Sequence, residues 1–197
     1  MRYLTDGPAD AARTFAFAHG AGGGMSTTFM TAVARGLGKE GIRVVRFEFP
    51  YMAAKRGSPD KPPVLMDAWR AVISDLGAAS LFIGGKSMGG RIATMVADEM
   101  KVRGVVCFGY PFHPPNRPEK LRTEHLETLK TPTLIVQGTR DTFGTRDEVA
   151  TYRLSKKIRI EWMEDGDHSL KPRKASGATE AQHLAHAIAT AAAFISQ

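Results

Sequence analysis

The sequence contains very little cysteine: one residue, Cys107, among 197. A single thiol excludes an intramolecular disulfide framework, and it excludes a zinc site built from several cysteines. A chain of this length buries roughly 70% of its unfolded surface, so it needs no disulfide or metal to fold. Cys107 lies in the apolar stretch 104–108, and we expect a buried core residue rather than a reactive thiol.

Long hydrophobic runs are also missing. A membrane-spanning helix needs about 18 consecutive apolar residues, and the longest candidate, 185–195, is rich in alanine and interrupted by His186. Residues 1–8 contain no apolar core of the kind that signal peptides have. We therefore expect a cytoplasmic protein with no membrane partner.

Neither sign of charge is concentrated in one part of the chain. The 27 Lys and Arg residues exceed the 20 Asp and Glu residues, which gives a net charge of +7. The first hundred residues contain 12 basic and 9 acidic groups and the rest contain 15 and 11, so the excess is evenly spread. Proteins that bind nucleic acid usually carry a basic arm or stripe. We therefore expect no nucleic-acid partner.

What the sequence does contain is a regular alternation of short apolar runs and longer amphipathic segments. This order is typical of an α/β protein with helices on both faces of a mainly parallel sheet. It predicts one domain, 1–197, with about six strands. We expect strands at 14–18, 43–47, 80–83, 104–108, 133–136 and 158–162, and helices at 27–40, 64–76, 88–100, 119–129, 147–154 and 180–195.

Residues 50–63 interrupt this alternation. They are rich in proline, glycine and lysine, and we expect neither a strand nor a helix there. Because they follow a predicted strand, they belong at the edge of the sheet where ligands bind in open α/β folds. A plain surface connection is the alternative.

The strongest chemical signal is the segment Gly85-Lys86-Ser87-Met88-Gly89, which fits the pattern G-x-S-x-G. It stands between a predicted strand and a predicted helix, as this pattern requires. Its glycines allow a sharp turn and close packing against neighbouring strands. The serine then lies at the start of the helix, where free N–H groups and the helix dipole favour developing negative charge. We predict that Ser87 is a nucleophile.

A serine nucleophile needs a base, and the base needs an acid that orients it. In hydrolases with this turn, the acid and then the histidine follow the serine along the chain. Asp141 comes shortly after the predicted strand 133–136, and His168 lies in a polar loop after the last strand. We predict that Asp141 is the acid and His168 the base. A salt bridge from Asp141 to Arg140 or Arg146 is the alternative.

Other histidines and acids are weaker candidates. We expect His125, His183 and His186 to face the solvent. Asp165 and Asp167 share the loop of the predicted base, which makes an approach to its Nδ1 atom difficult. The histidines at spacing i, i+3 have no visible third ligand, so we predict no metal site.

A second glycine-rich segment, His-Gly-Ala-Gly-Gly-Gly at 19–24, follows the first predicted strand. Small residues let the backbone bend so that an N–H group points at a substrate oxygen. We predict that the N–H groups of Ala21 and Met88 form an oxyanion hole. Phosphate binding is disfavoured because the pattern G-x-x-x-x-G-K-S/T is absent. A dinucleotide site with Glu48 on the ribose leaves the order of serine, aspartate and histidine unexplained.

Aromatic and basic side chains flank the predicted site. Loops that follow strands lie at the catalytic edge of such a sheet. We expect these loops to supply the substrate-binding residues Tyr51, Met52, Tyr110, Phe112 and His113. Five basic residues either form a positive rim that favours anionic acyl substrates or are ordinary surface charges: Lys55, Arg56, Lys86, Lys171 and Arg173.

The segments HGAGGG, GKSMGG, GTRD and DGDH resemble, in this order, the motifs of the α/β-hydrolase superfamily. KSMGGR, YPFHPP and DGDHSLKPRK are similar to segments of small bacterial hydrolases without a cap, which are related to dienelactone hydrolases and to the KANSL and testis-expressed proteins. The resemblance implies an α/β-hydrolase fold with no cap domain. We expect this chain to depart from larger members of the superfamily by lacking their two N-terminal strands. It implies the same roles for Ser87, Asp141 and His168. Dienelactone hydrolases use a cysteine nucleophile, so their lactone substrate does not transfer to this chain.

These observations predict a serine hydrolase that cleaves an ester or thioester of a small-molecule acyl substrate through an acyl-enzyme, with no metal or organic cofactor. Two alternatives remain open. One is a catalytically weak protein-interaction module with this fold, which an excess of exposed apolar groups near residues 111–115 would favour. An acyltransferase uses the same three side chains but passes the acyl group to an acceptor other than water.

Overall fold

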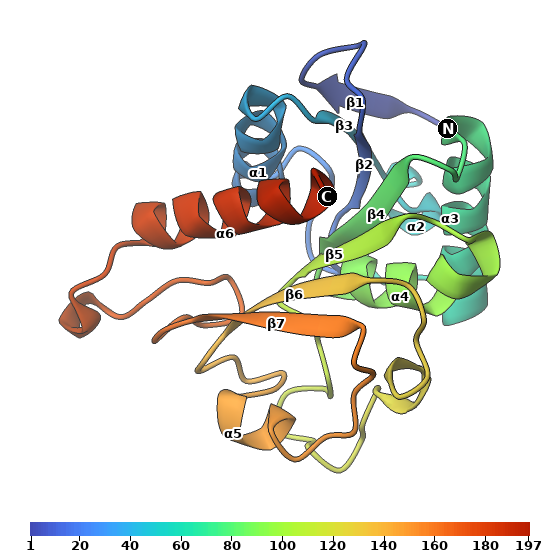
Figure 1. Cartoon of the computed structure of the whole chain (residues 1–197). Helices are drawn as coiled ribbons and strands as arrows, with labels where there is room; N and C mark the ends of the chain where they lie inside the picture. The colour runs from blue at the N-terminus through green and yellow to red at the C-terminus, as the bar shows by residue number, and fades with distance from the viewer.

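The computed structural model describes residues 1–197 and contains a seven-stranded sheet between two layers of helices (Figure 1). The strands are β1 (Tyr3–Asp6), β2 (Thr14–Ala18), β3 (Arg43–Phe47), β4 (Leu81–Lys86), β5 (Gly104–Phe108), β6 (Thr133–Gly138) and β7 (Ile158–Met163). The helices are α1 (Thr28–Lys39), α2 (Pro50–Ala53), α3 (Pro62–Leu76), α4 (Met88–Met100), α5 (Arg146–Val149) and α6 (Glu180–Ile195). Two short 3₁₀ helices, η1 (Glu124–Leu126) and η2 (Lys174–Ser176), lie in the connections.

The sheet has the strand order β1-β3-β2-β4-β5-β6-β7. The β1–β3 pair is antiparallel and the other five pairs are parallel. The central strands β4, β5 and β6 are buried almost throughout, because helices cover both of their faces. The predicted α/β class, with a mainly parallel sheet and helices on both faces, is confirmed.

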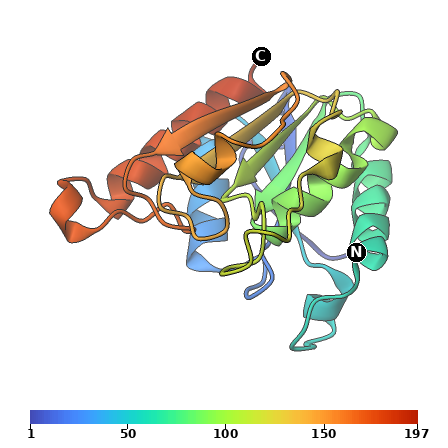
Figure 2. The same ribbon diagram turned by 90° about the horizontal axis from the view of Figure 1, so that it is seen from below.

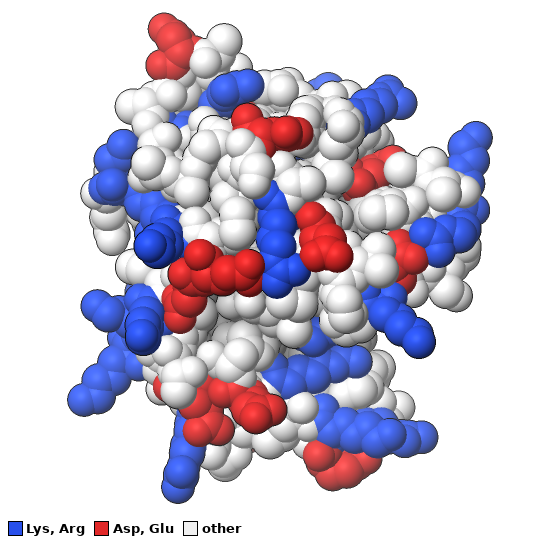
Figure 3. Space-filling view, turned by 90° about the vertical axis from the view of Figure 1, so that its right-hand side faces the viewer, with Lys and Arg blue, Asp and Glu red and all other residues white.

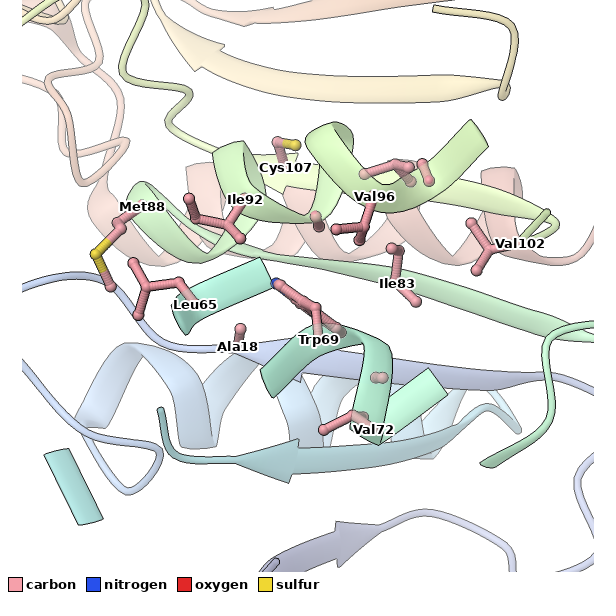
Figure 4. Close-up of a cluster of buried hydrophobic side chains, with 14 of the residues drawn as sticks. Ala18, Leu65, Trp69, Val72, Ile83, Met88, Ile92, Val96, Val102 and Cys107 are labelled. Carbon is pink, nitrogen blue, oxygen red and sulfur yellow. The ribbon is translucent and has the colours of Figure 1, made fainter. Parts of the chain in front are cut away.

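Helices α1 and α6 cover one face of the sheet, and α3 and α4 cover the other, as Figures 1 and 2 show from two directions. The indole of Trp69, a residue of α3, is fully buried against the sheet, and its ring centroid lies 4.8 Å from that of Phe47 in β3. Its Nε1 donates a hydrogen bond to Gly89 O at 3.2 Å. Figure 4 shows Trp69 in the same apolar cluster as Ile92 of α4. This packing fixes the start of α4, directly after Ser87.

Strand β1 raises the predicted number of about six strands to seven. It is a short edge strand whose side chains are at most partly buried, so no apolar run marks it in the sequence. Asp6 at its end forms a 2.7 Å ion pair with the buried Arg46 of β3. One antiparallel strand is therefore present at this edge, so the expectation that both N-terminal strands of larger members are missing is wrong.

The segment 119–129 does not form the predicted helix and contains only the three-residue η1. Three of its side chains are buried, and they recur every three residues: Thr123, Leu126 and Leu129. This spacing suits a 3₁₀ turn better than an α-helix. Contacts with distant segments hold it in place, since Phe112 O accepts a hydrogen bond from Arg122 N at 2.7 Å and Leu126 O accepts one from Ser155 N at 2.9 Å. Tertiary contacts thus override local helix propensity.

Two other predicted segments differ in extent. Residues 50–63 contain α2 and the start of α3, so the expectation of a loop without helix is wrong. Proline begins both helices, because a residue in the first turn needs no N–H group for the helix ladder. The predicted helix 147–154 shortens to α5, which starts with a capping box between Thr145 and Glu148.

Cys107 is fully buried, and burial raises the pKa of its thiol, so its predicted core position is confirmed. No helix combines the length and the apolar character needed to cross a membrane. On the face shown in Figure 3, basic and acidic side chains are interspersed rather than gathered in separate regions.

A packing prediction follows from Gly84 in β4. A β-carbon at this position would lie 1.8 Å from the carbonyl oxygen of Val106 in β5. We expect Gly84→Ala to lower the free energy of unfolding by at least about 1–3 kcal/mol, the usual cost of overpacking, in urea titrations followed by circular dichroism. Gly57→Ala is the matched control, because a β-carbon there meets no atom within 4 Å. A Gly84→Ala variant as stable as this control contradicts the packing.

Candidate active site

Ser87 lies between the end of β4 and the start of α4, with φ 51° and ψ −116°. Positive φ is strained for a residue with a β-carbon, and such strain often accompanies a functional position. The turn is held by a hydrogen bond from Ser87 N to Phe108 O at 3.0 Å. A β-carbon on Gly89 would lie 2.6 Å from His19 O, so glycine is what lets α4 approach the end of β2 this closely.

Three side chains from separate parts of the chain form a hydrogen-bonded series at this edge of the sheet. His168 Nε2 lies 2.8 Å from Ser87 Oγ, and His168 Nδ1 lies 2.8 Å from Asp141 Oδ2. Ser87 follows β4, Asp141 follows β6 and His168 follows β7, so the carboxyl ends of three parallel strands supply the three groups. This geometry lets the imidazole accept the serine proton while the carboxylate holds its other nitrogen as a donor.

Asp141 is fully buried and receives further hydrogen bonds. Its Oδ1 accepts one from Phe143 N at 2.9 Å, and its Oδ2 accepts one from Gln137 Nε2 at 2.9 Å. Gln137 is itself fully buried, and its Oε1 accepts a hydrogen bond from Tyr110 N at 2.6 Å. No sequence motif marks Gln137. A polar residue at the end of an apolar buried strand was the available signal, since buried polar groups need partners.

The alternative partners of Asp141 are bound elsewhere. Arg140 Nε lies 3.0 Å from a carboxylate oxygen of Asp165, and Arg146 Nη1 lies 3.2 Å from one of Glu164. A salt bridge from Asp141 to either arginine is therefore not formed. The carboxylate of Asp141 is oriented instead by uncharged donors and by the imidazole.

The loop that carries His168 is ordered by its own acidic residues. Asp165 accepts hydrogen bonds from Arg173 Nε at 2.7 Å and Arg173 N at 2.8 Å, and this pairing lowers the pKa of the Asp165 carboxyl to about 2. Asp167 Oδ1 accepts a hydrogen bond from Lys171 N at 3.0 Å. Both acids are thus occupied within the loop, and Nδ1 of His168 lies within hydrogen-bond distance of Asp141 instead.

The pKa of His168 lies below its ordinary value. Burial of the ring has the largest effect, and the charge of Lys86 acts in the same direction, whereas the hydrogen bond to Asp141 raises the pKa. The ring of Phe143 stacks on the imidazole with 4.1 Å between centroids and covers it from the solvent. The imidazole is therefore neutral near pH 7 and able to accept a proton.

The glycine-rich turn after β2 is fixed by two side chains. His19 Nδ1 donates a hydrogen bond to Gly20 O at 2.7 Å, while its Nε2 accepts one from Phe49 N at 3.1 Å. The hydroxyl of Tyr51 donates to Gly20 O at 3.3 Å and to Ala21 O at 2.9 Å. A trans peptide points its C=O and N–H groups in opposite directions. Holding Gly20 O on this side therefore turns the N–H group of Ala21 away, and that group donates to no atom of the chain.

A second free N–H group belongs to Met88. It is the first residue of α4, and the first N–H groups of a helix have no acceptor within the helix. No other backbone oxygen accepts a hydrogen bond from it. The turn after β2 and the turn after β4 thus each present an unused donor.

An open cavity of about 400 Å³ lies in front of Ser87 and His168. Ala21 and its neighbouring glycines form one wall. Phe29 and Met30 at the start of α1 supply apolar surface that the sequence analysis did not assign to the site. They were missed because α1 reads as an ordinary amphipathic helix, and its first turn shows no motif.

None of the five predicted substrate-binding residues lines this cavity. Each of the five follows a strand. Four of the side chains are buried: Tyr51, Tyr110, Phe112 and His113. The fifth, Met52, is partly buried against the core. Tyr51 supports the turn after β2, and Phe112 packs against the ring of Tyr110 at 4.7 Å. The prediction placed them at the correct edge of the sheet, but their side chains are used for packing.

Four of the five basic residues are ordinary surface charges and do not line the cavity: Lys55, Arg56, Lys171 and Arg173. Three of these four pair with acids, Arg56 with Asp60, Lys171 with Glu180 and Arg173 with Asp165. Only Lys86 lines the cavity, so the alternative of a positive rim is not formed. Lys86 Nζ donates a hydrogen bond to the carbonyl oxygen of His168. Burial lowers the pKa of Lys86 to about 8, an effect that the charges of Asp141 and Asp167 partly oppose.

Two of the three histidines expected at the surface are buried or partly buried. His125 Nε2 lies 2.9 Å from Thr94 Oγ1, and burial lowers the pKa of His125 to about 4. His183 is buried and its Nδ1 donates to Leu170 O at 2.8 Å. His186 is exposed, as predicted. No group of three or more His, Cys, Asp or Glu side chains is arranged to hold a metal ion.

Comparison with known proteins adds a family and a fold. Residues 11–196 match the family model described as an alpha/beta hydrolase domain. An α/β serine hydrolase without a lid from Xanthomonas campestris is 20% identical, with a TM-score of 0.70 over 98% of this chain and 85% of its own. Est1E from Butyrivibrio proteoclasticus is 14% identical, with a TM-score of 0.75 over 98% and 92%. A monoacylglycerol lipase from Paleococcus ferrophilus is 16% identical, with a TM-score of 0.69 over 95% and 98%.

At these identities the structural likenesses show the fold alone. The fold is that of the α/β hydrolases without a cap domain, which confirms the class predicted from the motifs.

The hydrogen bond between His168 and Asp141 can be tested by titration. Because Asp141 stabilises the imidazolium form, we expect Asp141→Asn to lower the pKa of His168 further below 6.5. Nuclear magnetic resonance of the imidazole protons measures this pKa in both proteins. His186→Gln, which removes an exposed histidine outside the site, is expected to leave it unchanged. A pKa of His168 that stays constant or rises in Asp141→Asn is the contradictory outcome.

Proposed function

The chain belongs to the alpha/beta hydrolase domain family, and from this premise we propose that it hydrolyses esters or thioesters of a small acyl substrate through an acyl-enzyme on Ser87. The observation that carries the proposal is the series of two 2.8 Å hydrogen bonds from Ser87 Oγ through the imidazole of His168 to Asp141. The open cavity beside Ser87 gives a small ester access to this series.

In the first half of the proposed reaction, Ser87 Oγ attacks the substrate carbonyl carbon while His168 Nε2 accepts the hydroxyl proton. The carbonyl oxygen becomes an oxyanion, and the N–H groups of Ala21 and Met88 donate hydrogen bonds to it. One such donor contributes about 3–4 kcal/mol in other enzymes. Asp141 stabilises the imidazolium. The tetrahedral intermediate then collapses, His168 protonates the leaving alcohol or thiol, and the acyl group stays on Ser87 Oγ.

In the second half, water takes the place of the leaving group. His168 Nε2 accepts a proton from the water as its oxygen attacks the acyl carbon, and the same two N–H groups stabilise the second oxyanion. Collapse releases the carboxylic acid and returns the proton to Ser87 Oγ. Because neutral His168 is required in both halves and its pKa is lowered, we expect the rate to hold constant down to below pH 6.5 and then to fall as acid protonates the ring.

The interaction-module alternative would be favoured by an excess of exposed apolar groups near residues 111–115. Residues 111–113 are buried, Pro114 is partly buried and Pro115 is exposed, so little apolar surface is exposed there. Large apolar side chains with substantial exposure occur at other places: Met1, Val64 and Leu121. They lie at scattered positions in the sequence.

The proposal is tested with a panel of p-nitrophenyl esters and matched thioesters. We expect turnover by the wild type and a loss of at least about 10⁴-fold in kcat for Ser87→Ala with its circular dichroism spectrum unchanged. Ser80→Ala, an exposed serine ahead of β4, is the matched control and is expected to keep full activity.

Rapid acid quenching and intact-mass measurement then locate the acyl group. Turnover by Ser87→Ala, or an acyl group on another residue, overturns the proposal. Adding an alcohol or an amine separates the two acyl-transfer functions. A hydrolase yields mainly the free acid, whereas an acyltransferase yields mainly the new ester or amide.

A further inference from the structure

The ammonium group of Lys86 carries a charge that no neighbouring acid neutralises at contact distance. Its one hydrogen bond within the chain goes to a neutral acceptor, the carbonyl oxygen of His168. It forms no ion pair with any carboxylate; Asp141 and Asp167 act on it only through longer-range attraction. An ammonium group has three donors, so two of them have no partner in the chain.

The buried cation Arg46 is bound differently. Arg46 is 5% exposed, and its guanidinium binds the Asp6 carboxylate at 2.7 Å and the carbonyl oxygen of Met25 at 2.7 Å. Buried charges are normally paired in this way, because removing a charge from water without a partner is costly. Lys86 is partly buried and lacks the acid that Arg46 has.

Two cavities give a ligand access to Lys86. Lys86 lines the 400 Å³ cavity in front of Ser87, and it also lines a second cavity of about 260 Å³ that extends under α6. Phe29 and Ser169 line both cavities as well, so the two adjoin at these three residues. Leu184 of α6 supplies apolar surface to the second cavity.

The junction offers polar and apolar contacts suited to a small organic anion. The ammonium of Lys86 stands 5.7 Å from the centroid of the Phe29 ring, which holds the charge over an apolar face. The hydroxyl of Ser169 can donate one more hydrogen bond. A ligand that joins an apolar chain to a terminal oxyanion matches both kinds of surface.

We propose that Lys86 binds a free carboxylate of the substrate at the junction of the two cavities, so that the enzyme prefers esters or thioesters that carry such a carboxylate. This inference rests on the proposed function of Ser87 for its catalytic part. Its binding part depends only on Lys86 and the two cavities.

The chemistry of the junction favours one negative charge over two. The site holds a single ammonium group, and acidic residues stand nearby: Asp167 acts on Lys86 from the loop of His168, and Glu180 lines the second cavity. A monoanionic carboxylate neutralises the ammonium, whereas a dianionic phosphate adds repulsion from both acids. Below pH 8 the ammonium is mainly protonated, so it is charged when a carboxylate arrives.

A kinetic test compares p-nitrophenyl esters in pairs of equal chain length, one ending in a free carboxylate and the other in its methyl ester. Both acyl-side and alcohol-side carboxylates are included, and the chain length is varied. We expect wild-type kcat/KM to be higher for the carboxylate of the best pair by about tenfold or more, the effect of one hydrogen bond to a charged group. Lys86→Met, of similar length and no charge, is expected to reduce this ratio to about one or less.

Lys174→Met is the matched control, because it removes one exposed positive charge by the same substitution. We expect it to keep the wild-type ratio. A ratio that stays high in Lys86→Met overturns the inference. An equal loss of kcat/KM for the carboxylate and for its methyl ester, with no change in their ratio, also overturns the inference. That result would show that Lys86 only holds the loop of His168 in place.

A binding test needs no turnover and separates this inference from the proposed function. Calorimetric titration with a dicarboxylic acid monoamide, which is not an ester, is expected to show binding to the wild type and to Ser87→Ala. We expect binding to Lys86→Met that is about tenfold weaker or more. Equal binding to all three proteins, or to none, overturns the carboxylate site. If the wild type turns over no ester but binds the monoamide in a way that depends on Lys86, the proposed function is overturned and the carboxylate site is supported.

Discussion

The 2.8 Å hydrogen bond between His168 Nδ1 and Asp141 Oδ2 is the contact on which the candidate site depends. It joins the loops after β6 and β7, and these two strands pair in parallel along their whole length. The bond fixes the ring so that Nε2 faces Ser87 Oγ. It also forms in a buried setting, where Asp141 has other donors and Phe143 covers the imidazole. Sheet register, burial and imidazole tautomer are therefore set together.

Much of this arrangement was predictable because it follows from local rules. The strand, the glycine-rich turn and the helix around Ser87 must adjoin in sequence for the strained turn to form, so a short pattern identifies them. Asp141 follows the buried strand β6 and His168 follows the partly buried edge strand β7, and parallel strands bring their carboxyl ends to one edge. The helices at 88–100 and 180–195 were located to the residue. The first begins directly after the motif serine, and the second begins with a capping box between Thr179 and Gln182.

What escaped prediction depends on side-chain direction and on distant contacts. Tyr110 and Phe112 follow a strand as a substrate loop does, but only the folded packing turns them into the core. The segment 119–129 contains helix-forming residues, and contacts with other loops hold it otherwise. Lys86 stands at the variable position of its motif, where sequence alone does not separate a surface charge from a partly buried one. Its lack of an acidic partner is visible only when every neighbour is known.

The most direct test of the central claim is labelling of the wild type with a fluorophosphonate, followed by intact-mass measurement and peptide mapping. An activated serine reacts with this probe, whereas an ordinary serine hydroxyl does not. The structure predicts a single adduct on Ser87 that disappears in Ser87→Ala and is lost or strongly slowed in His168→Ala. A folded wild type that forms no adduct, or one that is labelled equally fast without His168, contradicts the hydrogen-bonded series as a catalytic device.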